Sequence, residues 1–281
     1  MPFSTGLFFL RFRAFQPCCQ CRPPAAIPFL SMRIALTNDD GIQAPGLRAI
    51  YKALIEAGHT VDVVAPVTEQ SAVGHAVTIA MPLRVKVFHE NGFRGHGVYG
   101  TPTDCMKLGL SSLLEHKPEL VVSGINAGAN VGPDILYSGT VSAATEAAHM
   151  GYRAVALSYD SFRPEDISAH ARHAAALLPH IEWAGLPERC VVNINYPAVP
   201  VESIKGVRVC PQTRAVWHDW YEHRTDPRGG SYWWLNGVIP PETVAPGTDR
   251  ALLTEGYITV TPLRFDFTDS ETLTRLASLE E

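Results

Sequence analysis

The chain has 281 residues, of which 46% are hydrophobic and 18% are charged, and its formal net charge at pH 7 is −5. This balance excludes an intrinsically disordered chain, because the sequence holds enough apolar side chains to form a core. The negative net charge and the lack of a long Lys/Arg run argue against a surface that binds a nucleic-acid polymer. The length fits one large α/β domain or two smaller ones.

Residues 1–31 differ in composition from the rest of the chain. Their apolar run, residues 6–10, comes before Arg11 and Arg13, whereas a secretory signal peptide has its basic residues first. The run is also too short to span a bilayer. We expect residues 1–31 to be a disordered extension or to precede a true start at Met32, with an organelle-targeting segment as the alternative. Residues 32–281 are expected to form the α/β domain.

From Met32 onward, segments typical of strands alternate with segments typical of helices. The expected strands cover residues 33–36, 61–64, 83–88, 98–99, 120–122, 154–157, 191–194 and 257–260. The expected helices cover residues 45–57, 102–114, 139–150, 165–178 and 270–279. Thr101 and Asp104 form the pattern of a capping box at the start of the second helix. The alternation indicates βαβ units and predicts a three-layer, Rossmann-like α/β fold around a mostly parallel sheet.

Residues 211–256 differ from the alternating segments before them. Their pattern has little regular period, and large aromatic residues stand close together at Trp217, Trp220, Tyr221, Trp233 and Trp234. Large rings outside a regular core are typical of protein interfaces, and it is costly to leave so many of them in water. We expect a C-terminal hairpin or extension that serves oligomerisation, with a ligand-facing aromatic cluster as the alternative.

The most informative motif is Asn38-Asp39-Asp40-Gly41, directly after the apolar run at residues 34–36. Neighbouring side chains on a strand point to opposite faces, so adjacent carboxylates converge only where the chain bends. Gly41 permits such a bend because it tolerates positive φ. Converging carboxylates suit a hard divalent cation such as Mg²⁺, Mn²⁺ or Ca²⁺. The alternative is an acidic turn that caps the next helix.

Other polar segments follow strands that should end at the same edge of the sheet. A loop with Ser71 follows the second strand, residues 123–130 follow the strand at 120–122, and residues 137–140 open a helix. In open parallel sheets, ligands bind beyond the carboxyl ends of the strands. Carboxylate, hydroxyl and amide oxygens make a cation site, and a Ser/Gly/Thr segment at a helix N-terminus makes an anion site. Hydrolysis of a phosphate ester requires a cation beside an anion site.

These motifs resemble the signatures of the SurE family, the survival proteins with 5′-nucleotidase activity. The matching segments are NDDG (38–41), APG (44–46), GTPTDC (100–105), SGINAGAN (123–130), YSGTVSAA (137–144) and GYITVTPL (256–263). The resemblance covers residues 32–267, and several long motifs in one order are more specific than one short pattern. The loop departs from the family, which often has Ser-Gly where this chain has Ser71-Ala72-Val73-Gly74.

The resemblance implies a metal-dependent phosphomonoesterase that hydrolyses nucleoside 5′-monophosphates through a metal-activated water. Nucleoside 3′-monophosphates and polyphosphate are additional candidate substrates. The family pattern places one divalent metal ion, Mg²⁺ or Mn²⁺, on Asp39, Asp40, Ser71 and Asn126, with Asp39 as the catalytic partner of the water. It places the phosphate oxygens on Asn38, Asn130, Ser138, Gly139 and Thr140. It further implies a cytoplasmic homodimer or homotetramer that exchanges a C-terminal segment and binds neither a membrane nor a nucleic-acid polymer.

Three alternatives remain open at this point. A phosphatase with an aspartyl nucleophile has one residue between its two acids, whereas Asp39 and Asp40 are adjacent. A dinucleotide-binding domain has a Gly-x-Gly-x-x-Gly motif after its first strand, and Gly124, Gly128 and Gly132 lack that spacing and place. A non-enzymatic nucleotide sensor would bind a monophosphate without releasing phosphate.

The sequence also suggests roles for five other polar residues. His170 and His173 lie three residues apart on an expected helix, and we expect a solvated helix face there because no third metal ligand is suitably spaced. Glu146 is expected to be structural, since it lies beyond the first turn of its helix, where anion-site groups act. Arg214 and His218 are candidates for contact with a nucleobase or ribose.

Overall fold

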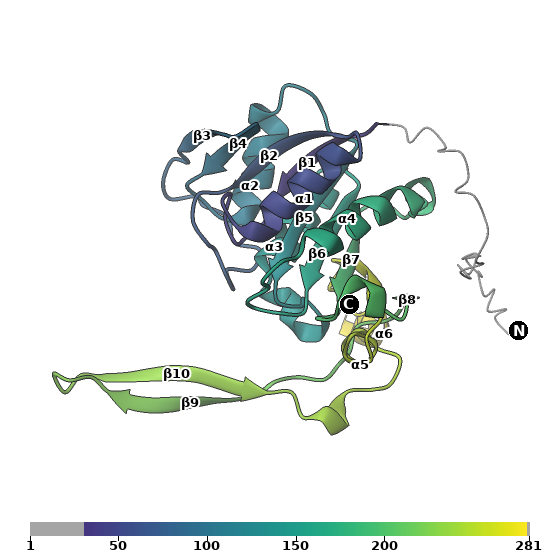
Figure 1. Cartoon of the computed structure of the whole chain (residues 1–281). Coiled ribbons are helices and arrows are strands. Elements are labelled where there is room, and N and C mark those ends of the chain that lie inside the picture. The colour runs from purple at the N-terminus through teal and green to yellow at the C-terminus, as the bar shows by residue number, and fades with distance from the viewer. Residues whose placement is uncertain (1–30, 280–281) are drawn as a thin grey trace, which may run out of the picture. The chain divides into compact units, whose positions relative to one another are not determined.

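The computed structural model describes residues 31–279, and within them a nine-stranded sheet organises the chain (Figure 1). Its strands are β1 (Arg33–Thr37), β2 (Thr60–Pro66), β3 (Val85–Glu90), β4 (Phe93–Val98), β5 (Leu120–Ala127), β6 (Ala154–Tyr159), β7 (Cys190–Tyr196), β8 (Val207–Val209) and β11 (Ile258–Arg264). The spatial order is β3-β4-β2-β1-β5-β6-β7-β11-β8. Strands β4, β2, β1, β5, β6 and β7 run parallel, whereas β3 and β11 are antiparallel to β4 and β7. The predicted mostly parallel sheet is confirmed.

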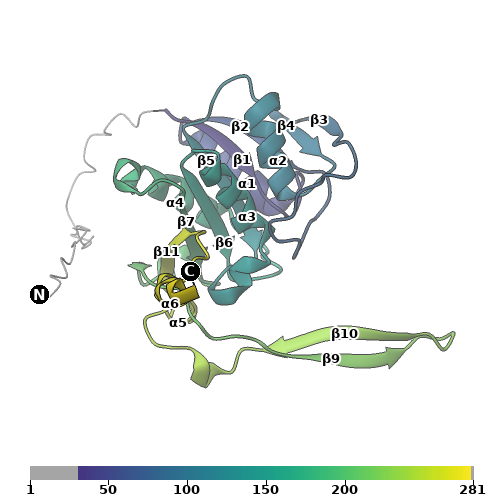
Figure 2. The same ribbon diagram turned by 180° about the vertical axis from the view of Figure 1, so that it is seen from behind.

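Helices cover both faces of this sheet (Figures 1 and 2). The α-helices are α1 (Pro45–Glu56), α2 (Pro102–Leu108), α3 (Gly139–His149), α4 (Ser168–Leu177), α5 (Asp249–Thr254) and α6 (Ser270–Leu276). A π-helical turn at Gly109–Leu113 extends α2, and 3₁₀ turns lie at Gly132–Leu136, Leu178–His180, Trp183–Gly185, Val201–Ser203, Pro241–Thr243 and Ala277–Leu279. Helices α1 and α4 pack in one apolar cluster with the sheet, and α2 and α3 in another. The three-layer architecture is therefore confirmed.

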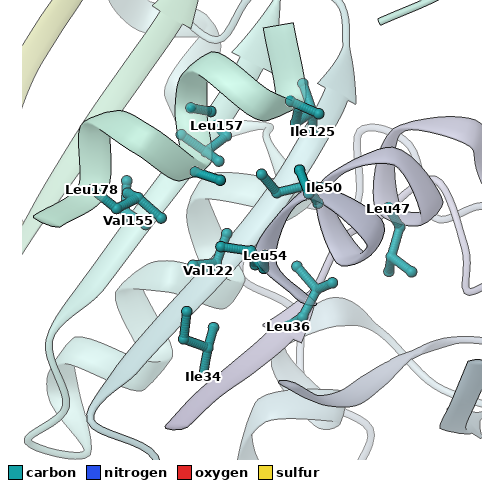
Figure 3. Packing of buried hydrophobic residues seen from close by; sticks show 14 of the residues in the cluster. Ile34, Leu36, Leu47, Ile50, Leu54, Val122, Ile125, Val155, Leu157 and Leu178 are labelled. Carbon is teal, nitrogen blue, oxygen red and sulfur yellow. The ribbon is translucent and has the colours of Figure 1, made fainter. Parts of the chain in front are cut away.

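The core beneath α1 shows why the alternating segments fold as they do (Figure 3). Leu47, Ile50 and Leu54 recur at helical spacing, and none of the three is exposed to solvent. They pack on side chains that strands β1, β5 and β6 present to the same face: Ile34, Leu36, Val122, Val155 and Leu157. Each such buried side chain contributes about 1.5–3 kcal/mol through removal of apolar surface from water. This core fixes the strand ends from which the polar loops leave.

The start of α2 confirms the capping box. Thr101 Oγ1 accepts a hydrogen bond from the Asp104 backbone N–H at 3.1 Å, and Asp104 Oδ2 accepts one from the Thr101 backbone N–H at 2.9 Å. Asp104 also accepts hydrogen bonds from the backbone N–H and the hydroxyl of Thr78, at 2.9 Å and 2.6 Å. The same carboxylate thus caps a helix and holds the loop that precedes β3.

Strands β9 (His218–Thr225) and β10 (Ser231–Val238) form a two-stranded antiparallel arm that projects from the sheet (Figures 1 and 2). Every residue of β9 is exposed, and so are Trp233, Trp234 and Leu235 of β10. Among residues 31–279, neither strand pairs with the main sheet. The structure therefore contains the predicted C-terminal hairpin, while its role in oligomerisation stays a prediction.

Several elements differ from the sequence expectations. Strand β4 begins at Phe93 rather than at residue 98, because Asn91 and Gly92 both have positive φ and turn the chain back into a hairpin with β3. Strand β8 and helix α5 were not expected. The predicted solvated face of α4 is wrong: His170 is buried with Nε2 2.9 Å from the Val199 carbonyl oxygen, and His173 Nδ1 lies 3.0 Å from the Tyr196 hydroxyl.

The expectations for residues 1–31 concern a segment that lies outside the described residues, except for Ser31. The Ser31 hydroxyl donates a hydrogen bond to the Gly58 carbonyl at 2.8 Å. In residues 31–279, no helix combines the length and the apolar character needed to cross a membrane.

Candidate active site

Polar residues from four separate segments line one pocket at the carboxyl ends of β1, β2 and β5. Its volume is ≈ 480 Å³, which lies within the range of about 300–1,000 Å³ that small-molecule sites occupy. The lining residues are Asp39, Asp40, Glu69, Ser71, Ala72, Asn126, Ala127, Gly128, Ala129, Asn130, Asp134, Tyr137, Ser138 and Phe162. The four predicted metal ligands are therefore brought together in one pocket. A smaller cavity of ≈ 210 Å³, lined in part by Arg33, Asp62 and His96, contains none of the predicted site residues.

The two adjacent acids both face this pocket because the chain bends directly after them. Gly41 has a φ of +102°, as the predicted bend requires. The Asp39 side chain accepts a hydrogen bond from the Thr140 hydroxyl, and Asp40 Oδ2 accepts one from the Ala127 backbone N–H at 3.2 Å. Asp39 is only 5% exposed, whereas Asp40 is half-buried. The carboxylates thus converge on one side of β1.

The first turn of α3 lies directly against Asp39. A Cβ atom added at Gly139 would stand 2.7 Å from Asp39 Cβ and 2.9 Å from Asp39 Oδ2, so only glycine leaves room for this contact. Ser138 caps the helix by accepting a hydrogen bond from the Val141 backbone N–H at 3.0 Å. The positive end of the helix dipole is thereby placed beside the carboxylate.

Asn126 reaches the pocket through an irregularity in β5. The pairing of β5 with β6 shifts register between Ser123 and Asn126, and such a bulge redirects the side chains that follow it. Asn126 Nδ2 donates to the Gly128 carbonyl at 2.7 Å, and its Oδ1 lies 3.5 Å from Thr140 Oγ1. The amide oxygen therefore faces the same hydroxyl group as Asp39.

Ser71 lies in the loop between β2 and β3. Its hydroxyl donates a 2.6 Å hydrogen bond to Glu69 Oε1, and the Gln70 backbone N–H donates to the Asp39 carbonyl at 2.8 Å. The loop is thus attached to the segment that carries the acids. Glu69 adds a third carboxylate to the pocket, which the sequence reasoning missed although this residue is two positions from Ser71.

Within residues 31–279, the two acids have no positively charged partner. Among the described residues, no Lys, Arg or His nitrogen lies within 4.0 Å of either carboxylate. Burial raises the pKa of Asp39 above its usual range, although the hydrogen bond from Thr140 opposes this shift. Burial, followed by the charge of Asp39, raises the pKa of Asp40 to about 6. Neighbouring buried carboxylates are unfavourable unless a proton or a cation neutralises them.

The donor set fits a divalent cation of the hard type. Asp39 and Asp40 offer two carboxylates, Ser71 and Asn126 offer neutral oxygens, and Mg²⁺ and Mn²⁺ prefer such oxygen ligands. Within residues 31–279, no group of three or more His, Cys, Asp or Glu side chains is arranged to hold a metal ion. An ion in this pocket would therefore depend on hydroxyl and amide oxygens as well as on the two acids.

Only some of the predicted phosphate ligands line the pocket. Asn130 and Ser138 line the pocket, and Asn130 Nδ2 donates to the Ser158 hydroxyl at 2.9 Å. Gly139 and Thr140 contact Asp39 instead of lining the pocket. Asn38 is fully buried and donates to the Gly41 carbonyl at 3.0 Å, so its side chain holds the turn. Phosphate binding by these residues stays a prediction.

Glu146 anchors the loop that carries Ser71. Its side chain is 10% exposed, its Oε1 accepts from Lys107 Nζ at 2.7 Å, and its Oε2 lies 2.8 Å from His75 Nε2. The hydrogen bond from His75, together with that from Lys107, lowers the pKa of Glu146 to about 2. His75 stands four residues after Ser71 in the same loop. The structural role expected for Glu146 therefore takes the form of an ion pair with Lys107 and a hydrogen bond with His75.

Some residues at the pocket carry no sequence signal that singles them out. Phe162, in the loop after β6, lines the pocket, as does Asp134, whose Oδ1 accepts a 2.6 Å hydrogen bond from Trp217 Nε1 at the base of the arm. Arg214 and His218, the sequence candidates for contact with a base or ribose, are exposed and do not line it.

Residues 34–219 match the family described as Survival protein SurE. The 5′-nucleotidase SurE of Nitratidesulfovibrio vulgaris (strain DSM 19637 / Miyazaki F) is 80% identical over 249 residues, which cover 89% of this chain and 93% of that protein. The 5′-nucleotidase SurE of Oleidesulfovibrio alaskensis (strain ATCC BAA-1058 / DSM 17464 / G20) is 76% identical over 245 residues, which cover 87% of this chain and 95% of that protein.

A solved structure is similar over the same extent. The crystal structure of SurE protein from Aquifex aeolicus matches with a TM-score of 0.77 and 34% sequence identity, covering 89% of this chain and 100% of that chain. This match bears out the α/β fold class that the alternating strands and helices predict.

Proposed function

The chain belongs to the SurE family, and we propose that it is a 5′-nucleotidase that hydrolyses nucleoside 5′-monophosphates to nucleoside and phosphate. The names of its close relatives support this reaction, and the pocket supports it independently. The observation that carries the proposal is the pair of adjacent carboxylates, buried Asp39 and half-buried Asp40, which line the pocket without a basic partner among the described residues.

A single divalent ion, Mg²⁺ or Mn²⁺, would be held by Asp39, Asp40, Ser71 and Asn126. When bound, such an ion supplies positive charge that polarises the phosphoryl group and makes water a stronger acid. The raised pKa values of the two acids support this assignment, because a cation offsets the cost of removing charged carboxylates from water.

The chain's own residues then orient the reactants. The Thr140 hydroxyl and the Gly139 backbone fix the Asp39 carboxylate, which accepts the proton of the attacking water. Asn130 and Ser138 border the pocket and would bind phosphate oxygens, as would the first turn of α3 at Gly139 and Thr140. Asn38 would act on the phosphate through the turn that it holds.

Two other readings remain as alternatives to this reaction. An aspartyl nucleophile would form a phosphorylated Asp39, and a nucleotide sensor would bind a monophosphate without turnover. Nucleoside 3′-monophosphates and polyphosphate are additional candidate substrates. The burial of Asp39 against Gly139 and Thr140 supports a positioned ligand and proton acceptor rather than a carboxylate free to attack.

We also propose that residues 32–281 work as one unit in a homodimer or homotetramer, with residues 211–256 exchanged between subunits. An isolated two-stranded hairpin is marginally stable in water, and the arm formed by β9 and β10 exposes several large rings. A partner subunit would cover those rings.

The test of the proposed reaction is the release of phosphate from a panel of nucleoside 5′- and 3′-monophosphates and polyphosphate, with and without EDTA. Turnover of 5′-monophosphates that EDTA stops and Mn²⁺ or Mg²⁺ restores supports the proposal. Nucleotide binding without phosphate release under every metal condition supports the sensor instead, and trapping of phosphorylated Asp39 supports the aspartyl nucleophile.

A further inference from the structure

Two exposed aromatic rings border the pocket that holds the carboxylates. Tyr137 follows the 3₁₀ turn at Gly132–Leu136 and is 65% exposed, and Phe162 in the loop after β6 is 85% exposed. Single exposed rings are common on protein surfaces and need no explanation. These two differ, because both belong to the wall of one pocket that also contains Asp39 and Asp40.

The Phe162 ring packs on Gly128 at the edge of the pocket. A Cβ atom added at Gly128 would lie 2.7 Å from Phe162 Cε1 and 3.0 Å from its Cδ1, so the ring rests directly on the Gly128 backbone. The rest of the ring is open to solvent. Gly128 follows Asn126 by two residues, so the ring stands next to the segment that supplies the amide oxygen of the proposed metal site.

Tyr137 is fixed through its backbone, which leaves its ring available. Its N–H donates to the Asp134 carbonyl at 3.0 Å, and its carbonyl accepts from the Gly74 N–H at 3.0 Å. It precedes Gly139, which packs on Asp39, by two residues. Tyr137 therefore belongs to a segment that builds the carboxylate end of the pocket, and Phe162 packs on another such segment. Both rings stand close enough to that end to contact the part of a small phosphate ester that lies away from its phosphate.

The chemistry of the two rings selects among phosphate esters. The Phe162 ring has no group that can hydrogen-bond a phosphate or a sugar hydroxyl, whereas any nucleobase can stack through its π-face on this ring or on the ring of Tyr137. Stacking is tolerant of base identity, because no hydrogen bond reads the edge of the base. The rings thus suit a general nucleobase, not one particular base.

We propose that Phe162 and Tyr137 form a stacking surface for the substrate's nucleobase and make the chain prefer nucleotides over phosphate esters that lack a base. This inference rests on the proposed nucleotidase function and extends it to substrate selection. Neither residue takes part in the proposed metal site or in proton transfer.

The experiment compares AMP with ribose 5-phosphate, which keeps the sugar and the phosphate but has no base. Phe162→Ala should lower kcat/KM for AMP by about 5- to 100-fold, the range for the loss of one stacked base. It should leave kcat/KM for ribose 5-phosphate unchanged. Tyr137→Ala should also lower kcat/KM for AMP and leave that for ribose 5-phosphate unchanged. Phe162→Tyr and Tyr137→Phe keep an aromatic ring, so both should keep the preference for AMP.

Phe267→Ala is the matched control, because Phe267 is also highly exposed, at 81%, but does not line the pocket. Phe267→Ala should leave kcat/KM unchanged for both AMP and ribose 5-phosphate. Equal effects of Phe162→Ala on AMP and ribose 5-phosphate, or no effect on either, overturn the inference. So does a native chain that does not distinguish the two substrates.

Calorimetric binding in EDTA separates this inference from the proposed reaction. A chain that releases phosphate from neither compound contradicts the nucleotidase proposal. In that case, weaker AMP binding by Phe162→Ala with unchanged ribose 5-phosphate binding still supports the stacking surface, and unchanged AMP binding overturns it.

Discussion

The Asp39 carboxylate and the Asn126 amide oxygen meet at one hydroxyl group, although they come from different strands. Thr140 Oγ1 donates to Asp39 Oδ1 and lies 3.5 Å from Asn126 Oδ1. Asp39 follows β1, Asn126 lies in the bulged part of β5, and Thr140 is in the first turn of α3. Three elements far apart in sequence therefore bring their side-chain oxygens together at the Thr140 hydroxyl, and a cation site built from oxygen ligands needs oxygens gathered from separate elements in this way.

Asp39→Asn should abolish phosphate release while the fold persists. The neutral amide neither balances the charge of a cation nor accepts a proton from water, so the rate should fall by at least about 1,000-fold. Phosphate assays give the rate, and circular dichroism with thermal unfolding checks the fold. Asp62→Asn, which removes a carboxylate 3.0 Å from Arg33 outside the pocket, should keep the native rate. Retention of more than about a tenth of the activity by Asp39→Asn would count against the site.

Gly139→Ala should impair turnover by displacing Asp39. The added methyl group would lie 2.7 Å from Asp39 Cβ, closer than carbon atoms approach. A shift of this kind in a reacting group should lower kcat/KM by about 100-fold. Gly185→Ala is the control, because its Cβ atom would find its nearest neighbour at 3.8 Å. If the two alanine variants had equal activity, close packing of α3 on Asp39 would not matter to the reaction.

Glu146→Gln should weaken the fold in a pH-dependent manner. The pKa of Glu146 is about 2 in the folded chain against an ordinary value of 4.5. Its contacts with Lys107 and His75 therefore stabilise the fold above pH 4.5 and lose that effect as the pH falls toward 2. The variant should be less stable than the native chain by about 2 kcal/mol at pH 7, with a smaller deficit at pH 3.

Urea unfolding between pH 3 and pH 7 measures this deficit. Glu188→Gln removes an exposed acid that forms no ion pair among the described residues, and it should change stability little at any pH. A Glu146→Gln deficit that is as large at pH 3 as at pH 7 would show that packing, not charge, explains the effect.

Removal of the arm should dissociate the proposed oligomer. The native chain should run in light scattering at two or four times its mass of 30.7 kDa. Replacement of residues 218–238 by a short Gly-Ser linker should yield a monomer, because the exposed rings of β9 and β10 would no longer find a partner. The Phe267→Ala chain should keep the native mass. A monomeric native chain, or an unchanged mass without the arm, would contradict this role.

Local sequence signals were sufficient for the elements that carry the site. The capping box of Thr101 and Asp104 is present at the start of α2, and Gly41 has the positive φ that the bend after the acids demands. Both features follow from interactions between residues a few positions apart, which is why the sequence alone reveals them. The same kind of signal was overlooked at Asn91-Gly92, where a tight turn joins β3 to β4.

Side-chain direction at the site could not be predicted in the same way. Phosphate binding by Thr140 and Asn38 stays a prediction, but the sequence did not indicate that Thr140 contacts Asp39 or that Asn38 is buried in the turn. At a bend or a helix start, the direction of a side chain depends on packing from distant segments. Phe162 was missed because only the folded chain brings its loop to the pocket, whereas Glu69 lies two positions from the predicted ligand Ser71, in a loop that the sequence already places there.

Binding of Mn²⁺ to the chain, after treatment with chelator and dialysis, shows whether the pocket that contains Asp39 and Asp40 holds a divalent ion. Titration followed by electron paramagnetic resonance counts the bound ions and gives their affinity. We expect one Mn²⁺ per chain in the native protein and in Asp62→Asn, with binding weakened at least about 100-fold in Asp39→Asn and in Asp40→Asn. A native chain that binds no Mn²⁺, or an Asp40→Asn chain that binds it as tightly as the native one, would contradict the account.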